Sequence, residues 1–209
     1  MKRGTIVLSR DCAGDQPSGG RDRPRVRLIL THGAGSNRNA PLLVALERAL
    51  AEPFDVLRLD LAFRQARAKG PPRPHEAARD REGLKAAVEE ARAAGYQRVF
   101  AGGHSYGGRQ ASMLAAEEPG LIDALLLLSY PLHPPGRAEQ KRTAHFAALH
   151  TPALFVSGDR DPFGTPAELR EAIALIPART EFMIVPATAH DLRGGAERAA
   201  DAWVEFLKS

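Results

Sequence analysis

The chain has 209 residues, of which 44% are hydrophobic, with a formal net charge of +4 and a single cysteine, Cys12. This length suits one α/β domain over residues 1–209, and a lone cysteine excludes an intramolecular disulfide. The 24 arginines and 5 lysines are scattered along the chain and only 12 residues are aromatic, so we expect no nucleic-acid-binding function.

The amino-terminal region predicts a short strand over residues 5–8 and then a mobile loop over residues 11–23, which is rich in Gly, Pro, Asp and Arg. The basic start is followed by polar residues before an apolar segment of signal length develops. No apolar run approaches the length of a membrane span. We therefore expect a cytoplasmic protein that does not associate with membranes.

A glycine-rich loop follows the next predicted strand, which covers residues 25–31, and leads into an amphipathic helix marked by leucines at 42, 43, 46 and 50. Backbone N–H groups in such a loop can bind a phosphate or stabilise an oxyanion. A dinucleotide-binding fingerprint needs a third glycine where Arg38 stands, so nucleotide binding is the weaker alternative. The sequence favours an oxyanion-binding role for the N–H of Ala34, with His32 ordering the loop.

Strands and helices alternate along the rest of the chain. Strands are predicted over residues 56–61, 98–101, 122–129, 152–157 and 181–185, and helices over residues 76–94, 106–117, 166–176 and 197–207. Segments 63–75 and 130–151 are predicted to be loops, with a short helix at most in the second. This order predicts a doubly wound, mostly parallel sheet of about six or seven strands with helices on both faces. Ligands bind at the carboxyl ends of such strands.

The clearest motif is Gly-x-Ser-x-Gly, with Ser105 between Gly103 and Gly107 at the junction of a predicted strand and helix. A serine on so sharp a turn projects its hydroxyl away from the sheet, as a nucleophile requires. The N–H of Tyr106, the next residue, would then join that of Ala34 in an oxyanion hole.

A nucleophilic serine needs a base, and the base needs an acid that orients it. Of the seven histidines, His190 alone follows the last predicted strand, which gives the chain order expected for this sheet. Asp161 and Asp159 both follow the strand before it. We favour Asp161 as the acid, because Asp159 directly follows a glycine and suits a turn.

These motifs resemble the α/β-hydrolase superfamily over nearly the whole chain. Residues 32–37, 129–135 and 157–165 more narrowly resemble a small subfamily of predicted serine hydrolases that is related to dienelactone hydrolases and lacks a lid domain. The subfamily is also similar to a regulatory subunit of a histone-acetyltransferase complex. The resemblance therefore implies a hydrolase and leaves a non-catalytic binding or scaffold protein as the alternative.

We predict a carboxylesterase-type serine hydrolase that acts on a small-molecule ester without a metal or cofactor. Segment 130–151 offers three prolines and few apolar residues, so it cannot roof a long hydrophobic tunnel. We therefore expect a preference for short acyl groups. The expected walls of an open cleft are Phe63, Arg64, Tyr130, Leu132 and Phe163, with Arg64 either solvated or facing a substrate carboxylate.

Overall fold

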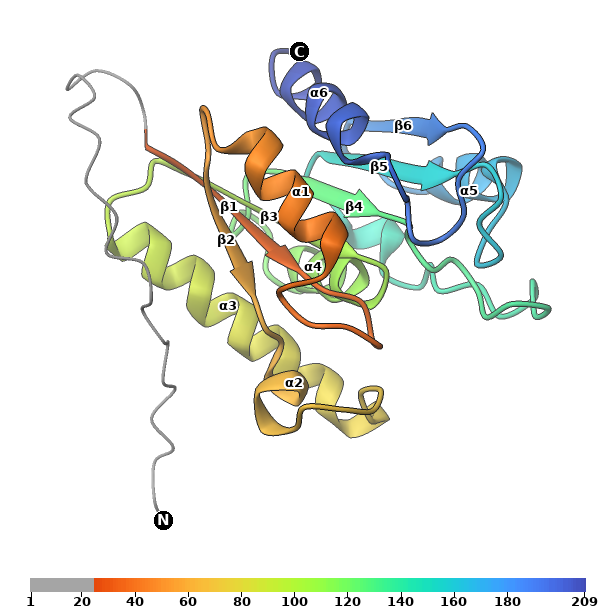
Figure 1. The fold of residues 1–209 in the computed structure, drawn as a ribbon, viewed down its shortest axis with the longest axis horizontal. Coiled ribbons are helices and arrows are strands. Elements are labelled where there is room, and N and C mark those ends of the chain that lie inside the picture. The colour runs from red at the N-terminus through yellow and green to blue at the C-terminus, as the bar shows by residue number, and fades with distance from the viewer. Residues whose placement is uncertain (1–24) are drawn as a thin grey trace.

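Six parallel strands form one sheet in the computed structural model, which describes residues 25–209 (Figure 1). The strand expected at residues 5–8 and the loop expected at 11–23 lie outside these residues. The sheet order is β2-β1-β3-β4-β5-β6, and every neighbouring pair is parallel. The strands are β1 (Val26–Thr31), β2 (Asp55–Leu59), β3 (Arg98–His104), β4 (Leu125–Leu128), β5 (Ala153–Gly158) and β6 (Thr180–Val185).

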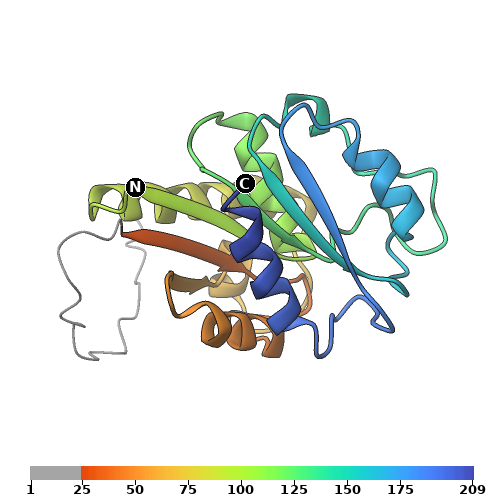
Figure 2. The ribbon, with the colours of Figure 1, turned by 90° about the horizontal axis from the view of Figure 1, so that it is seen from above.

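Helices cover both faces of the sheet. They are α1 (Pro41–Leu50), α2 (Ala62–Ala66), α3 (Ala77–Ala93), α4 (Tyr106–Glu117), α5 (Pro166–Ile173) and α6 (Ala196–Phe206), with two short 3₁₀ helices, η1 (Pro74–Glu76) and η2 (Phe146–Ala148). Seen from above, α1 and α6 lie on one face while α3, α4 and α5 lie on the other (Figure 2). The doubly wound fold predicted from the alternating elements is therefore confirmed.

Two apolar cores separate these layers. One core joins α1 and α6 to the sheet, and in it the ring of Trp203 packs edge-on against Phe100 with centroids 5.3 Å apart. The other joins α3, α4 and α5 to the opposite face. The four leucines of β4 are all buried because the two cores cover alternate residues of the strand. A strand covered on both faces reads as an unbroken apolar run.

The prediction of a plain loop over residues 63–75 is wrong. This segment contains most of α2 and begins η1. A helix of five residues is too short to show a helical hydrophobic period in the sequence. It forms here because Phe63 is buried against the rings of His32 and Tyr106, and because Asp80 accepts the N–H of Phe63 at 2.9 Å near the helix start.

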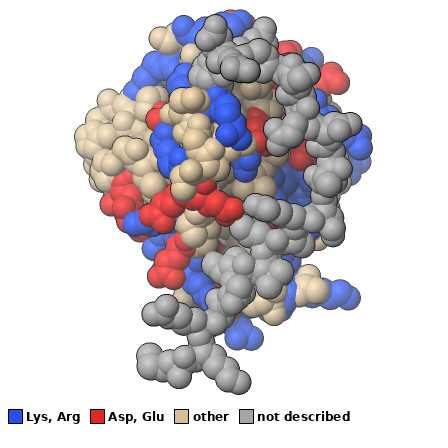
Figure 3. Space-filling view, turned by 90° about the vertical axis from the view of Figure 1, so that its left-hand side faces the viewer, with Lys and Arg blue, Asp and Glu red and all other residues tan. Residues whose placement is uncertain are grey.

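Charged side chains of both signs are interspersed on the face drawn in Figure 3. Several pair with one another, and Arg81–Glu117 and Lys85–Glu118 connect α3 to the end of α4.

Within residues 25–209, no helix combines the length and apolar character that crossing a membrane requires.

The sheet reverses its winding direction between β1 and β3. The chain leaves β1 for α1 on one face and leaves β3 for α4 on the other (Figure 2). Loops diverge at such a point and open a crevice at the carboxyl ends of the strands. The glycine-rich loop after β1 and the turn after β3 meet there.

Candidate active site

Ser105 occupies a strained turn between β3 and α4. Its φ and ψ are 52° and −116°, a region that residues with a Cβ rarely adopt. The turn brings β3 and α4 so close to β1 that only glycine fits beside it. A Cβ on Gly103 would lie 2.1 Å from the carbonyl oxygen of Thr31, and one on Gly107 would lie 2.5 Å from Oγ1 of Thr31. These close approaches explain both glycines of the motif.

A chain of hydrogen bonds connects Ser105, His190 and Asp161. Nε2 of His190 lies 2.8 Å from Oγ of Ser105, and its Nδ1 lies 2.8 Å from Oδ2 of Asp161. Because a carboxylate only accepts, Nδ1 carries the proton, which leaves Nε2 free to accept one from the serine hydroxyl. The three side chains come from the ends of β3, β5 and β6, so parallel strands bring them to one edge.

Asp161 rather than Asp159 contacts His190. The Asp161 side chain is 1% exposed, and it also accepts hydrogen bonds from the N–H of Phe163 at 2.9 Å and the hydroxyl of Ser157 at 3.3 Å. Asp159 is exposed. The ring of Phe163 lies 4.2 Å from that of His190 and tilted by 32°, so it covers one face of the imidazole.

The loop expected to bind an oxyanion lies beside Ser105. A Cβ placed on Gly33 would be 3.7 Å from Cβ of Ser105, which brings the next residue, Ala34, close to the nucleophile. Among residues 25–209, no acceptor is found for the N–H of Ala34. Tyr106 is the first residue of α4, where a backbone N–H has no partner within the helix. Both N–H groups therefore remain available to a ligand.

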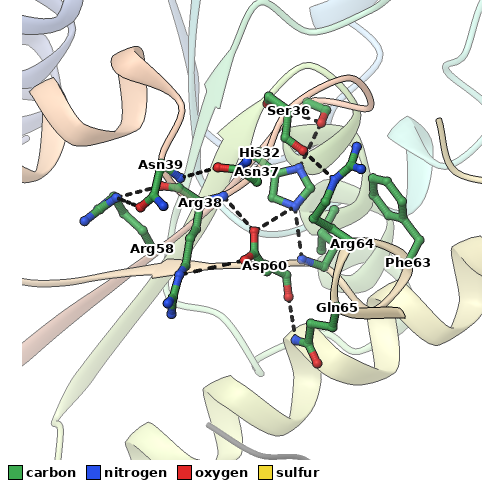
Figure 4. Close-up of polar contacts among 12 residues, drawn as sticks. His32, Ser36, Asn37, Arg38, Asn39, Arg58, Asp60, Phe63, Arg64 and Gln65 are labelled. Atoms are coloured by element: carbon green, nitrogen blue, oxygen red, sulfur yellow. Dashed lines mark hydrogen bonds and ion pairs between the residues drawn. The ribbon is translucent and has the colours of Figure 1, made fainter. Parts of the chain in front are cut away.

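His32 orders this loop from beneath. It is fully buried, its Nδ1 lies 2.8 Å from the Gly33 carbonyl, and its Nε2 accepts the N–H of Leu61 at 3.2 Å. Burial lowers the pKa of His32, which matches the neutral ring that these two bonds need. Asp60, whose carboxylate accepts the N–H of Arg38 at 2.7 Å, closes the far end of the loop (Figure 4).

A family model described as an α/β hydrolase domain matches residues 24–202. The chain belongs to the α/β-hydrolase family. That assignment supports a hydrolase activity, and the fold matches it: residues 25–209 form a six-stranded parallel sheet covered by helices and contain no lid over the strand ends.

Solved structures share this α/β-hydrolase fold at low sequence identity. Est1E of Butyrivibrio proteoclasticus, solved with bound ferulic acid, is 17% identical and has a TM-score of 0.71, covering 93% of this chain and 94% of that one. A dienelactone hydrolase of Anabaena variabilis is 20% identical with a TM-score of 0.68, covering 90% and 87%. A serine hydrolase homologue of Coxiella burnetii is 20% identical with a TM-score of 0.69, covering 89% and 88%.

Five side chains were expected to line the substrate cleft. Of these, Phe163 alone lies against the hydrogen-bonded residues Ser105, His190 and Asp161, because its ring packs on His190. Phe63, Tyr130 and Leu132 are 2% exposed or less, so they fill the core of this α/β hydrolase and do not form walls of an open cleft. The Tyr130 ring packs against Phe146 and Phe155, and its hydroxyl donates to the Arg142 carbonyl at 2.7 Å. Arg64 is neither solvated nor facing a cleft, because it is buried and bonded to carbonyls.

A hollow of about 660 Å³ lies instead between the amino-terminal ends of α1 and α6. Its walls include Ser36 from the glycine-rich loop, His104 directly before Ser105, and Asp191 directly after His190. The remaining lining is mostly apolar and comprises Ala40, Pro41, Leu42, Ala45, Leu192, Arg193, Gly194, Ala196 and Glu197. The volume is in the range of small-molecule sites.

Asp80 is a buried residue that the sequence reasoning missed. Its Oδ2 accepts the Tyr106 hydroxyl at 2.7 Å, while its Oδ1 accepts the N–H of Phe63. The Tyr106 side chain is thereby held toward α3, and burial raises the pKa of its hydroxyl. The sequence does indicate that Asp80 is buried, because it stands four residues before Leu84 and so on the buried face of α3.

Across residues 25–209, no three histidine, cysteine or carboxylate side chains gather as a metal site requires.

Proposed function

We propose that the protein is a serine hydrolase that cleaves a small carboxylic ester. Ser105 is the nucleophile, His190 the general base, and Asp161 the group that orients His190. The observation that carries the proposal is the hydrogen-bonded chain from Ser105 Oγ through His190 to Asp161, with 2.8 Å at each junction. An activated serine is distinguished by such a chain.

The reaction would proceed in two halves. Oγ of Ser105 attacks the ester carbonyl carbon while its proton passes to Nε2 of His190, and the carbonyl oxygen becomes an oxyanion facing the N–H groups of Ala34 and Tyr106. The C–O bond to the alcohol then breaks, and the alcohol leaves with the proton from His190. Water, deprotonated by the same ring, next attacks the acyl carbon. The bond from that carbon to Oγ of Ser105 breaks, His190 returns the proton to Oγ, and the acid leaves.

A second serine-histidine pair supports the assignment by contrast. Ser112 Oγ lies 2.9 Å from Nε2 of His145. Burial and the positive charges of Arg109 and Arg81 lower the pKa of His145 to about 4, so this ring is a poor base at neutral pH. No carboxylate contacts His145 among the described residues. Of these two pairs in residues 25–209, the one at Ser105 has the carboxylate that stabilises a protonated imidazole.

The hollow between α1 and α6 would take the apolar part of the substrate. It shares walls with the three segments that carry Ala34, Ser105 and His190. Its volume of about 660 Å³ is that of a small-molecule site and accommodates a group such as butyryl or benzoyl. We therefore retain the expectation of small esters while moving the binding surface from the predicted side chains to this hollow.

A fluorophosphonate probe tests the proposal, since activated serines react with it and ordinary serines do not. We expect wild-type protein to be labelled and Ser105→Ala to be inert. Ser112→Ala is the matched control, because it removes a serine that also faces a histidine, and it should be labelled like the wild type. A folded wild-type protein that the probe does not label would contradict the proposal and favour the non-catalytic scaffold.

A further inference from the structure

Arg64 on α2 is a buried cation whose hydrogen bonds go to backbone carbonyls. It is 8% exposed. Its Nε donates to the Ser36 carbonyl at 2.7 Å, and one Nη donates to the carbonyls of Ala34 and Gly70 at 3.1 Å each. Figure 4 shows the bond from Arg64 to Ser36 beneath the glycine-rich loop. Among residues 25–209, the guanidinium has no carboxylate partner.

The glycine-rich loop depends on hydrogen bonds because little packs against its tip. Gly35 is exposed, and a Cβ placed on it would meet no atom within 4 Å. Within the loop, the N–H of Ser36 donates to the Gly33 carbonyl at 3.1 Å. Arg64 holds the carbonyls on either side of Gly35. It therefore determines how the peptide groups next to the Ala34 N–H are oriented.

The charge of Arg64 adds to this geometric effect. A buried arginine without a counter-charge is costly to desolvate, and its hydrogen bonds to the loop carbonyls offset part of that cost. Stability alone therefore does not explain why the side chain at this position is charged. A fixed cation behind the loop does favour the negative charge that develops on an oxygen bound at the Ala34 N–H. That charge is absent from the ester ground state, so Arg64 should act mainly on the transition state.

We propose that Arg64 is a positioning residue that fixes the oxyanion-binding loop and stabilises the charge formed there. The proposal rests on the proposed function, since it needs an oxyanion at Ala34. It assigns Arg64 a part in turnover and none in substrate recognition.

The test compares kcat and KM of Arg64→Met with those of the wild type on a short-chain ester. Loss of a hydrogen-bond system on a charged group should lower kcat by about 10- to 100-fold, with KM little changed. The inhibition constant of a trifluoromethyl ketone, whose adduct with Ser105 carries an oxyanion, should rise by the same factor as kcat/KM falls. A purely structural role would lower the melting temperature without this matched change.

Arg58→Met is the matched control. Arg58 on β2 also donates from Nη1 to a loop carbonyl, that of Arg38, at 2.8 Å, but this carbonyl lies beyond the oxyanion-binding residues (Figure 4). It should lose stability and keep the wild-type kcat. If Arg64→Met does not fold, Arg64→Lys decides. Lysine keeps the positive charge, but its single ammonium cannot span the carbonyls of Ala34, Ser36 and Gly70. We expect kcat to fall by a smaller factor than that expected for Arg64→Met.

Two outcomes separate this proposal from the proposed function. A wild-type protein that the fluorophosphonate does not label removes the serine hydrolase itself. A wild-type protein that is labelled, with a folded Arg64→Met or Arg64→Lys variant that keeps the wild-type kcat and ketone affinity, overturns the role of Arg64 alone.

Discussion

Nε2 of His104 lies 2.7 Å from the backbone carbonyl oxygen of His190. Because a carbonyl only accepts, Nε2 carries the proton and the His104 ring is the donor. Burial lowers the pKa of His104, which keeps the ring neutral with Nδ1 facing Gly33. His104, the residue directly before Ser105, is therefore bonded to the loop that carries His190.

His104→Leu should therefore lower kcat by up to about tenfold, the effect of one lost hydrogen bond on the position of His190. His104→Gln keeps an N–H donor of similar reach and should recover much of the loss. Steady-state kinetics on a short ester measures both variants. Wild-type kcat in the folded leucine variant would show that the tether has no effect on turnover.

Asp161→Asn should lower kcat by about three to four orders of magnitude, because an amide favours the wrong imidazole tautomer. Asp159→Asn, two residues earlier at an exposed position, is the matched control and should have a mild effect. Circular dichroism checks that both variants fold, since Asp161 also accepts the Phe163 N–H. The reverse ranking would assign the orienting role to Asp159.

Ala45→Phe should reduce the size of substrate that the enzyme accepts, because Ala45 lines the hollow between α1 and α6. We expect kcat/KM for a benzoate ester to fall by about tenfold or more, and the value for an acetate ester to stay near that of the wild type. Ala49→Phe, one turn along α1 at an exposed position, is the control and should change neither value. Equal losses on both esters in Ala45→Phe would place the substrate elsewhere.

Protonation of His145 should destabilise the fold in acid. Its pKa is lowered from 6.5 to about 4 on folding, so between these values the unfolded chain binds more protons and the free energy of unfolding falls as pH decreases. His145→Gln removes this proton uptake while keeping a partner for Ser112. Urea midpoints at pH 7.5 and pH 5 should therefore differ less in the variant than in the wild type. An unchanged difference would mean that His145 does not contribute.

The sequence by itself determined the α/β alternation, the turn at Ser105 and the glycine-rich loop at Ala34, because each leaves a local pattern. Apolar runs mark strands covered on both faces, and Gly103 and Gly107 are needed by a turn whose neighbouring backbone lies within 2.6 Å of their missing Cβ atoms. The order of strands along the chain also identified His190 as the candidate base, because it is the one histidine after the last strand.

Only the tertiary structure decided which side chains surround these elements, because such contacts depend on residues distant in the chain. No motif specifies the residue type of Asp80 on α3, Arg64 on α2 or His104 on β3, yet each bonds to a segment at the site. The prediction that Phe63, Tyr130 and Leu132 line the substrate pocket was wrong for the same reason. Tyr130 and Leu132 follow a strand end, as residues of a ligand site do, but their large apolar surfaces are more stable when buried in the core than exposed at the sheet edge.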